Sequence, residues 1–284
     1  MELIKDIKKM QTIADRARQA GKRIALVPTM GALHEGHLTL MDQARSRADV
    51  VVVSIFVNPI QFGPQEDFEK YPRDPGKDSR LTEKRGVDIL FAPEARDIYP
   101  PDFQTRVTVE KVTRNLCGAV RPGHFQGVTT VVCKLFHIVK PHLALFGQKD
   151  YQQLMVIRQM VNDLNMDVEV TGIPTVREAD GLAMSSRNAY LSAEERISAR
   201  SLSRALNEAR SLFVRGERES RVLLDRATDL ISRQPGSRIE YAKVCHPRTL
   251  EDISVIEEGG LLALAVWIGA TRLIDNCLLE EKPS

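Results

Sequence analysis

The nearly continuous apolar run from Val50 to Val57, which reads VVVVSIFV and has Ser54 as its one polar residue, is the feature that most restricts the fold of this chain. A strand with one face in water alternates apolar and polar residues, whereas a parallel strand covered on both faces is apolar throughout. Shorter runs at 23–27, 87–91 and 142–146 have the same character. We therefore expect a parallel sheet with both faces covered.

Segments with helical periodicity separate these runs. Leu40, Met41 and Ala44 are spaced for one helix face, a further helical segment lies near 78–85, and 128–139 is strongly amphipathic until Pro141 stops it. Another helix is expected over 154–164, followed by an extended stretch at 168–176. Such alternation predicts an α/β fold with a doubly wound parallel sheet, whose ligand site lies beyond the carboxyl ends of the strands.

The pattern changes after about residue 178. Two amphipathic helices, over 202–213 and 223–231, precede two or three strands at 239–244, 261–268 and 273–276. We therefore expect a first domain at 1–178 and a smaller α+β domain at 179–284.

Composition excludes several functional classes. The 284 residues carry 40 basic and 38 acidic side chains, so no basic footprint points to a nucleic-acid partner. The four scattered cysteines lack metal-site or disulfide spacing and are expected to be reduced thiols. The charged N-terminal segment has no apolar core typical of a secretory signal, and no stretch is long enough to span a membrane, so we expect a cytoplasmic protein.

The first candidate site is the sequence His34-Glu35-Gly36-His37, between a predicted strand and a predicted helix. Two histidines three positions apart can both project from the first helical turn, where free backbone N–H groups favour a phosphate. Gly36 leaves room for a nucleotide to approach. A metal-binding pair or an ordinary loop is the alternative.

The second candidate is Asn58 with Gln61, just beyond the longest apolar run. Their amides can donate to and accept from the hydroxyls and carboxylate of a small acid. The Asn58-Pro59 pair also favours a turn, and this explanation is preferred for Asn58 alone.

Two further blocks supply groups for phosphate and ribose. In 146–153, Lys149 offers a point charge, Asp150 either binds ribose or caps a helix, and Gln153 follows one turn later. In 177–188, Ser185, Ser186 and Arg187 suit a pyrophosphate clamp. An inter-domain linker with a capping serine is the alternative interpretation of the same residues.

Other polar residues are less informative. Arg121, in the sequence RPGHF, either faces a substrate carboxylate or belongs to a simple proline-glycine turn. His137 and His142 flank a predicted helix end and are expected to be structural, and His246 is given no role.

Taken together, these blocks closely resemble the pantothenate synthetase family. The matching segments are PTMGALHEGH from Pro28, VSIFVNPIQF from Val53, FGQKDYQQ from Phe146, DGLAMSSRN from Asp180, YPRDP, RPGHF and the closing VWIGATRLIDN. The resemblance implies a ligase that condenses pantoate with β-alanine. Its first domain, at 1–178, is then a Rossmann-like domain of the HIGH-motif nucleotidyltransferase class that binds ATP and pantoate, and the smaller domain at 179–284 closes over the site. This resemblance also implies that the enzyme uses ATP and Mg²⁺, passes through an acyl-adenylate, releases AMP and pyrophosphate, and is a homodimer.

The resemblance also implies roles for individual residues. His34 and His37 contact ATP phosphates, Gly36 lies by the adenosine, Asp150 binds ribose, and Asp78 lies near a metal held mainly by ATP phosphates. The residues implied to hold pantoate are Met30, Asn58, Gln61 and Gln153. The residues implied to hold phosphates, and with the two histidines to form the catalytic set, are Lys149, Ser185, Ser186 and Arg187. The remaining positions expected in the ATP site are Pro28, Met30, Gly147, Val176 and Met184.

Three alternatives remain at this stage. A related nucleotidyltransferase leaves a nucleotide on its product, an aminoacylation-type protein binds RNA, and a regulator binds nucleotide without catalysis. Free AMP that appears only with an amine distinguishes the ligase from the first. Near-zero net charge and the lack of an anticodon-type domain disfavour the second. The two histidines, the lysine and the loop arginine disfavour the third.

Overall fold

The computed structural model describes residues 1–64 and 66–281. By internal contacts the chain divides into two compact units. The first comprises residues 1–113, 117–148 and 153–174, and the second comprises 114–116, 149–152 and the chain from 175 onward. The domain boundary expected at residue 178 stays a prediction.

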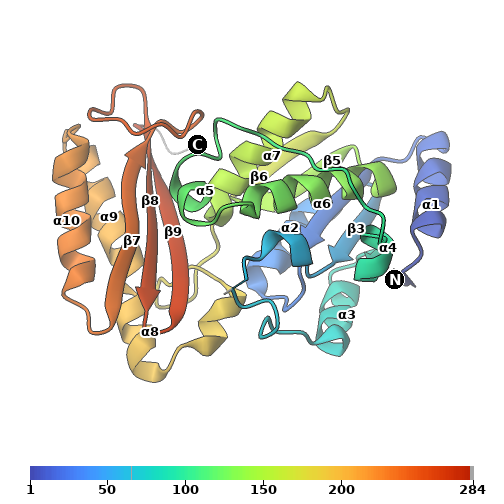
Figure 1. Ribbon diagram of the computed structural model, residues 1–284, viewed down its shortest axis with the longest axis horizontal. Helices are drawn as coiled ribbons and strands as arrows, with labels where there is room; N and C mark the ends of the chain where they lie inside the picture. Colours follow the sequence, from blue (N-terminus) through green and yellow to red (C-terminus); the bar gives the residue numbers. More distant parts are fainter. Residues whose placement is uncertain (65, 282–284) are drawn as a thin grey trace. The chain divides into compact units, whose positions relative to one another are not determined.

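A parallel sheet forms the centre of the first unit (Figure 1). Among the described residues it has six strands in the order β1-β4-β3-β2-β5-β6. The strands are β1 (Glu2–Ile4), β2 (Ile24–Thr29), β3 (Val50–Ile55), β4 (Ile89–Phe91), β5 (Leu143–Gly147) and β6 (Glu169–Ile173). The chain moves outward from β2 to β3 and β4, and then returns to place β5 on the other side of β2. The strand order therefore reverses between β2 and β5, where ligands bind in such sheets.

Helices connect these strands. They are α1 (Ile7–Gln19), α2 (Glu35–Arg45), α3 (Pro75–Lys84), α4 (Ala95–Ile98), α5 (Leu116–Val120), α6 (His124–Val139) and α7 (Tyr151–Asp163). Short 3₁₀ turns follow β3 at Pro59–Gln61 and β5 at Gln148–Asp150. The predicted doubly wound parallel sheet is confirmed.

The burial of the central strand β2 explains why its sequence is almost entirely apolar. Ala25 and Val27 pack with Met41 of α2, while Leu26 points to the opposite face. All four side chains are fully buried, so both faces of the sheet are covered. Because α2 and α6 both contact β2, the loops that begin at its carboxyl end are held between packed elements.

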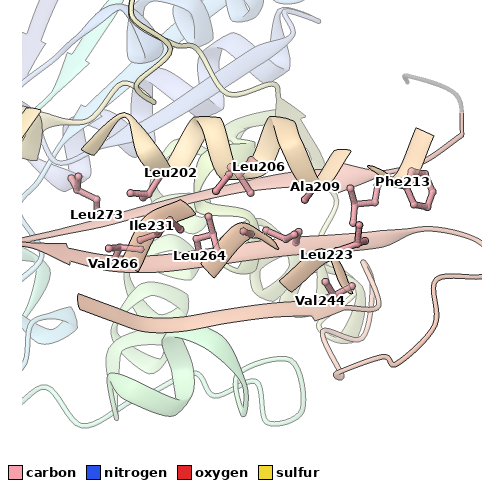
Figure 2. Close-up of a cluster of buried hydrophobic side chains, with 14 of the residues drawn as sticks. Leu202, Leu206, Ala209, Phe213, Leu223, Ile231, Val244, Leu264, Val266 and Leu273 are labelled. Carbon is pink, nitrogen blue, oxygen red and sulfur yellow. The ribbon is translucent and has the colours of Figure 1, made fainter. Parts of the chain in front are cut away.

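The second unit contains an antiparallel sheet and helices packed against it. Within the described residues its three strands run in the order β7-β8-β9, with β7 (Ser237–Cys245), β8 (Gly260–Ile268) and β9 (Thr271–Leu279). Its helices are α8 (Ala193–Ala199), α9 (Ser201–Val214) and α10 (Ser220–Ser232), and a 3₁₀ turn spans Ser186–Tyr190. Figure 2 shows Leu206 and Phe213 of α9 and Leu223 of α10 in one cluster of buried side chains with Leu264 and Val266 of β8. The expected α+β composition of this part of the chain is confirmed.

Two local expectations differ from the structure. Leu164 was expected on the apolar face of a helix, but α7 ends at Asp163 and Leu164 is 51% exposed. Asn165 then takes a left-handed backbone conformation with φ 50°, which ends the helical path. Strand β1 was not expected, because three residues are too few to show a period.

No helix in the described part of the chain is long and apolar enough to cross a membrane. The four cysteines are free thiols, as expected.

Candidate functional site

The loop after β2 depends on two consecutive left-handed residues, Gly31 at φ 80° and Ala32 at φ 50°. A Cβ at Gly31 would lie 2.9 Å from Asp78 Oδ2 and 3.1 Å from Ile55 Cγ2, so glycine is required for both its conformation and its close approach. Thr29 Oγ1 accepts from the N–H of Gly31 at 3.2 Å and donates to the carbonyl of Ser54 at 2.8 Å. The loop is thus tied to β3.

Asp78, on α3, fixes the same loop from a distance in sequence. Its two carboxylate oxygens accept from the backbone N–H groups of Ala32 and Leu33 at 2.9 and 2.8 Å, and its side chain is buried. The described residues include no group of three or more histidine, cysteine, aspartate or glutamate side chains that would hold a metal ion. The structure therefore shows Asp78 as a support for the loop, and its metal role stays a prediction.

The two expected histidines lie at the start of α2. His34 is the residue before the first turn, and its backbone N–H donates to Nδ1 of His37 at 3.4 Å. The two imidazole rings stack, with centroids 4.1 Å apart. Because Nδ1 of His37 accepts, Nε2 carries the proton and is a donor. Imidazole donors at a helix N-terminus suit an anionic group.

Asn58 and Gln61 meet at the end of β3. Asn58 Nδ2 donates to Gln61 Oε1 at 2.9 Å and to the carbonyl of Gly127 at 3.0 Å, and Gln61 Nε2 donates to Met30 Sδ at 3.3 Å. Asn58 is only 1% exposed and precedes the 3₁₀ turn that Pro59 begins. Three residues expected to hold the acid substrate are therefore in contact. For Asn58, the turn expected from sequence is also present.

Gly127 permits this arrangement. A Cβ at that position would lie 2.5 Å from the carbonyl oxygen of Ile60 and 2.6 Å from Cα of Gln61, so α6 approaches the turn more closely than any side chain allows. Sequence reasoning did not single out Gly127. The available signal was a glycine inside a strongly amphipathic helix, which usually has a packing reason.

Arg121 belongs to an ordered network beside this turn. Its Nε donates to Glu66 Oε1 at 2.7 Å, and a second nitrogen contacts the other carboxylate oxygen. Burial raises the pKa of the Glu66 carboxyl, but the hydrogen bond and charge of Arg121 outweigh burial and hold that pKa below its ordinary value. His124 lies 2.8 Å from the carbonyl of Gln61 through Nδ1. Arg121 therefore pairs with a carboxylate of the chain itself, and the contact with a substrate carboxylate stays a prediction.

The segment after β5 carries the expected lysine. Gly147 is the last residue of β5, and the 3₁₀ turn Gln148–Asp150 leads into α7, where Gln153 is half-buried. Lys149 Nζ lies 3.8 Å from Asp150 Oδ2. Asn276 of β9 donates from Nδ2 to the carbonyl of Lys149 at 2.8 Å. Residues 149–152 are therefore anchored within the second unit.

The expected phosphate clamp lies on a braced turn. Met184 N–H donates to the carbonyl of Val176 at 3.0 Å, and Gly181 makes the reversal at φ 90°. Ser185 Oγ accepts from the N–H of Arg187 at 3.3 Å, so this serine does cap a short helix, as one reading of the sequence expected. Asn188 Nδ2 donates to the carbonyl of Ala183 at 3.0 Å. This segment is thus a structured turn, and its phosphate role stays a prediction.

Arg177 supports the same turn. Its guanidinium pairs with both carboxylate oxygens of Asp275 at 2.6 and 3.0 Å and also donates to the carbonyl of Gly181 at 3.2 Å. Asp275 is only 3% exposed, so this pair joins β9 firmly to the turn.

The expected site residues therefore fall into two groups by unit. Those of the first unit are Pro28, Met30, His34, Gly36, His37, Asn58, Gln61, Asp78, Gly147 and Gln153. Those of the second unit are Lys149, Asp150, Val176, Met184, Ser185, Ser186 and Arg187.

Known proteins resemble the chain over almost its whole length. The family model described as pantoate-beta-alanine ligase matches residues 2–278. A pantothenate synthetase of Geotalea daltonii is 59% identical over 282 residues, which cover 99% of this chain and 100% of that protein. The pantothenate synthetase of Geobacter sulfurreducens is 57% identical, with the same coverage of both chains.

Solved structures agree. Pantothenate synthetase from Thermus thermophilus superposes with a TM-score of 0.94 at 46% identity, covering 99% of this chain and 100% of that one. Pantoate-beta-alanine ligase from Francisella tularensis, solved in complex with beta-gamma ATP and beta-alanine, gives a TM-score of 0.81 at 35% identity over the full length of both chains. The chain therefore belongs to the pantoate-beta-alanine ligase family and is an enzyme that condenses pantoate with β-alanine at the expense of ATP.

Proposed function

We propose that the condensation runs through a pantoyl-adenylate, with release of pyrophosphate and then AMP. A carboxylate does not react with an amine at neutral pH, so it must first gain a better leaving group. In the first half-reaction a pantoate carboxylate oxygen attacks the α-phosphorus of ATP, and the bond from that phosphorus to pyrophosphate breaks. In the second, the β-alanine nitrogen attacks the acyl carbon, the bond to AMP breaks, and the nitrogen loses a proton.

One observation carries this proposal. The loop that follows β2 bears Met30, which contacts Gln61, and leads directly to His34 and His37 at the start of α2. The Gln61 donor, which suits a small acid, thus contacts the same short loop that leads to the histidine donors suited to phosphate. Adenylate formation needs mainly such positioning and neutralisation of charge, and no protein nucleophile.

The first unit supplies donors for the acid and part of ATP in this mechanism. Gln61, Met30 and Gln153 hold pantoate, while Asn58 acts beside them. His37 donates from Nε2 to a phosphate oxygen, and His34 extends the same donor surface. The positions beside the adenosine are Pro28, Gly36 and Gly147.

The second unit supplies most of the positive charge. Lys149, Ser185, Ser186 and Arg187 bind the phosphates and stabilise the charge that develops on pyrophosphate as it leaves. Asp150 accepts from the ribose hydroxyls. Val176 and Met184, whose backbones are paired, border the nucleotide.

We propose that Mg²⁺ accompanies ATP. The described residues form no cluster suited to enclose a metal, whereas Mg²⁺ commonly keeps several waters and binds through nucleotide phosphates. The ion neutralises phosphate charge when bound. Asp78, whose oxygens accept from the loop amides, is proposed only as an acidic neighbour of this ion.

We also propose that the enzyme is a cytoplasmic homodimer whose other partners are its small substrates. The family resemblance and the nearly balanced charge, 40 basic against 38 acidic residues, support this proposal. Sedimentation equilibrium at micromolar concentration tests the assembly. A monomer under those conditions contradicts it.

The adenylate mechanism is tested by Lys149→Ala. We expect the variant to keep its fold and lose most pantoate-dependent exchange of labelled pyrophosphate into ATP, because charge neutralisation at the leaving group is lost. Lys22→Ala, at an exposed turn, is the matched control and is expected to retain exchange. Normal exchange by Lys149→Ala contradicts the assigned role.

A further inference from the structure

The Asn58 amide has a fixed polarity. One of its neighbours, the backbone carbonyl of Gly127, can only accept a hydrogen bond, and it lies 3.0 Å from Asn58 Nδ2. The NH₂ group must therefore face Gly127, and Oδ1 must face the opposite way. There Oδ1 meets the hydroxyl of Tyr99 at 2.8 Å, which has to donate.

The polarity of Asn58 determines the polarity of Gln61. The second N–H of Asn58 donates to Gln61 Oε1 at 2.9 Å, so the carbonyl end of the Gln61 amide is used internally. Its Nε2 is left facing Met30, where it makes a hydrogen bond to sulfur at 3.3 Å. Thioether sulfur is a weak acceptor, so a hydroxyl or carboxylate oxygen readily replaces it. Gln61 thus presents a donor to an arriving ligand.

Tyr99 is well placed to hold this polarity. It follows α4, and its ring lies beside those of Phe56 and Phe103, with centroids 6.1 and 5.0 Å away. Burial raises the pKa of the Tyr99 phenol well above its usual value, against a smaller opposing effect of Arg106. The hydroxyl therefore keeps its proton at physiological pH and can donate to Asn58 Oδ1, while the packed ring keeps it in place.

We propose that Tyr99 is a positioning residue for the acid substrate. Its hydroxyl, together with the carbonyl of Gly127, holds the orientation of the Asn58 amide, and Asn58 in turn makes Gln61 present its NH₂ group to an oxygen of pantoate. This inference rests on the proposed role of Gln61. It adds that Asn58 acts through Gln61, since hydrogen bonds inside the chain use its oxygen and both of its N–H groups.

The first test is Tyr99→Phe, which keeps the ring and removes only the donor. Oδ1 of Asn58 then lacks a partner, and the amide gains freedom to rotate. For the loss of one neutral hydrogen bond we expect KM for pantoate to rise about fivefold to tenfold. KM for ATP, KM for β-alanine and kcat should change less than about twofold, because the same bond does not involve them.

A packing control distinguishes the effect of losing the Tyr99 hydroxyl from the effect of disturbing the packing of its ring. Phe103→Leu alters the ring neighbour of Tyr99 and leaves its hydroxyl in place, so KM for pantoate should stay at the wild-type value. An equal rise in Phe103→Leu and Tyr99→Phe assigns the effect to packing and overturns the proposal.

A double-mutant cycle tests the route through Gln61. Gln61→Ala alone should raise KM for pantoate, and adding Tyr99→Phe to it should have no further effect. If Tyr99→Phe is equally harmful without Gln61, the positioning role is wrong, although Gln61 keeps its substrate role. If Gln61→Ala leaves KM unchanged, both the substrate role and the inference built on it fail.

The wild-type enzyme offers a second readout should Tyr99→Phe fold poorly. With ¹⁵N-labelled asparagine and glutamine, both side-chain protons of Asn58 should be protected from exchange with water, and the Gln61 NH₂ resonances should shift with pantoate alone. Rapid exchange of the Asn58 protons, or Gln61 resonances that ignore pantoate, overturns the proposal.

Discussion

Gly127→Ala is the most informative packing variant of this enzyme. The added methyl would lie 2.5 Å from Ile60 O, 2.6 Å from Gln61 Cα and 2.7 Å from Gln61 N. Ordinary contacts begin near 3.4 Å, so the turn or the helix must move by about 0.9 Å. All three obstructing atoms are backbone, and no side chain can rotate away.

The magnitude follows from two opposing effects. Overpacking of this kind costs about 1–3 kcal/mol. Replacing glycine by alanine in a helix returns about 0.5–1 kcal/mol. We therefore expect a net loss of up to roughly 2.5 kcal/mol in the free energy of unfolding. Because Gln61 shifts with the turn, kcat/KM for pantoate should fall by about tenfold to a hundredfold. This loss comes from the misplaced Gln61 amide and not from unfolding of the enzyme.

Gly76→Ala provides the matched control. Gly76 lies in α3, and its nearest neighbours, at 3.5 Å and beyond, are ends of the flexible side chains of Arg80 and Asp74. It should therefore gain stability from helix propensity. Urea unfolding of both variants, combined with steady-state rates of AMP release, makes the comparison. A Gly127→Ala enzyme with wild-type stability and wild-type kcat/KM refutes the argument from close approach.

Two further predictions concern the second unit. Arg177→Met leaves the buried carboxylate of Asp275 without its partner and should cost roughly 3 kcal/mol in urea unfolding, whereas adding Asp275→Leu should restore most of it; a single variant as stable as the wild type contradicts this. Burial raises the pKa of Glu240, but hydrogen bonds from Arg272 and Trp267 outweigh it and the pKa is lowered, so its stabilisation is present above about pH 4.5 and lost as pH falls through the folded pKa. Glu240→Gln should therefore lose roughly 1–3 kcal/mol at pH 7, and its difference from the wild type in thermal unfolding should shrink as the pH falls below 4.5; a difference independent of pH contradicts this.

The sheet could be predicted because burial on both faces leaves a direct mark on sequence. The run from Val50 to Val57 and the short run that became β2 are almost entirely apolar because both of their faces are buried. Strand β1 left no such mark. It has only three residues, too few to show a period, and its parallel pairing to β4 holds it in the sheet. Leu164 shows the converse error. The apolar period of α7 continues to this residue in the sequence, but the helix ends at Asp163 and Leu164 is exposed.

The site could be predicted in its parts and not in its supports. His34 and His37 follow a strand and begin a helix, a context visible in sequence, whereas the link from Asp78 to the backbone of Ala32 and Leu33 spans about 45 positions. A hydrogen bond between a carboxylate and backbone N–H groups far away in the chain produces no periodic pattern in the sequence. The same holds for Tyr99, whose partner Asn58 lies 41 positions away. These supports depend on tertiary packing, so only the structure reveals them.

The central claim is tested most directly by omitting each component from a reaction that contains ATP, Mg²⁺, pantoate and β-alanine. The adenylate mechanism predicts that labelled pyrophosphate exchanges into ATP with pantoate alone. It also predicts that steady AMP release needs β-alanine as well. Exchange that requires β-alanine, or AMP release that proceeds at full rate without it, contradicts the mechanism.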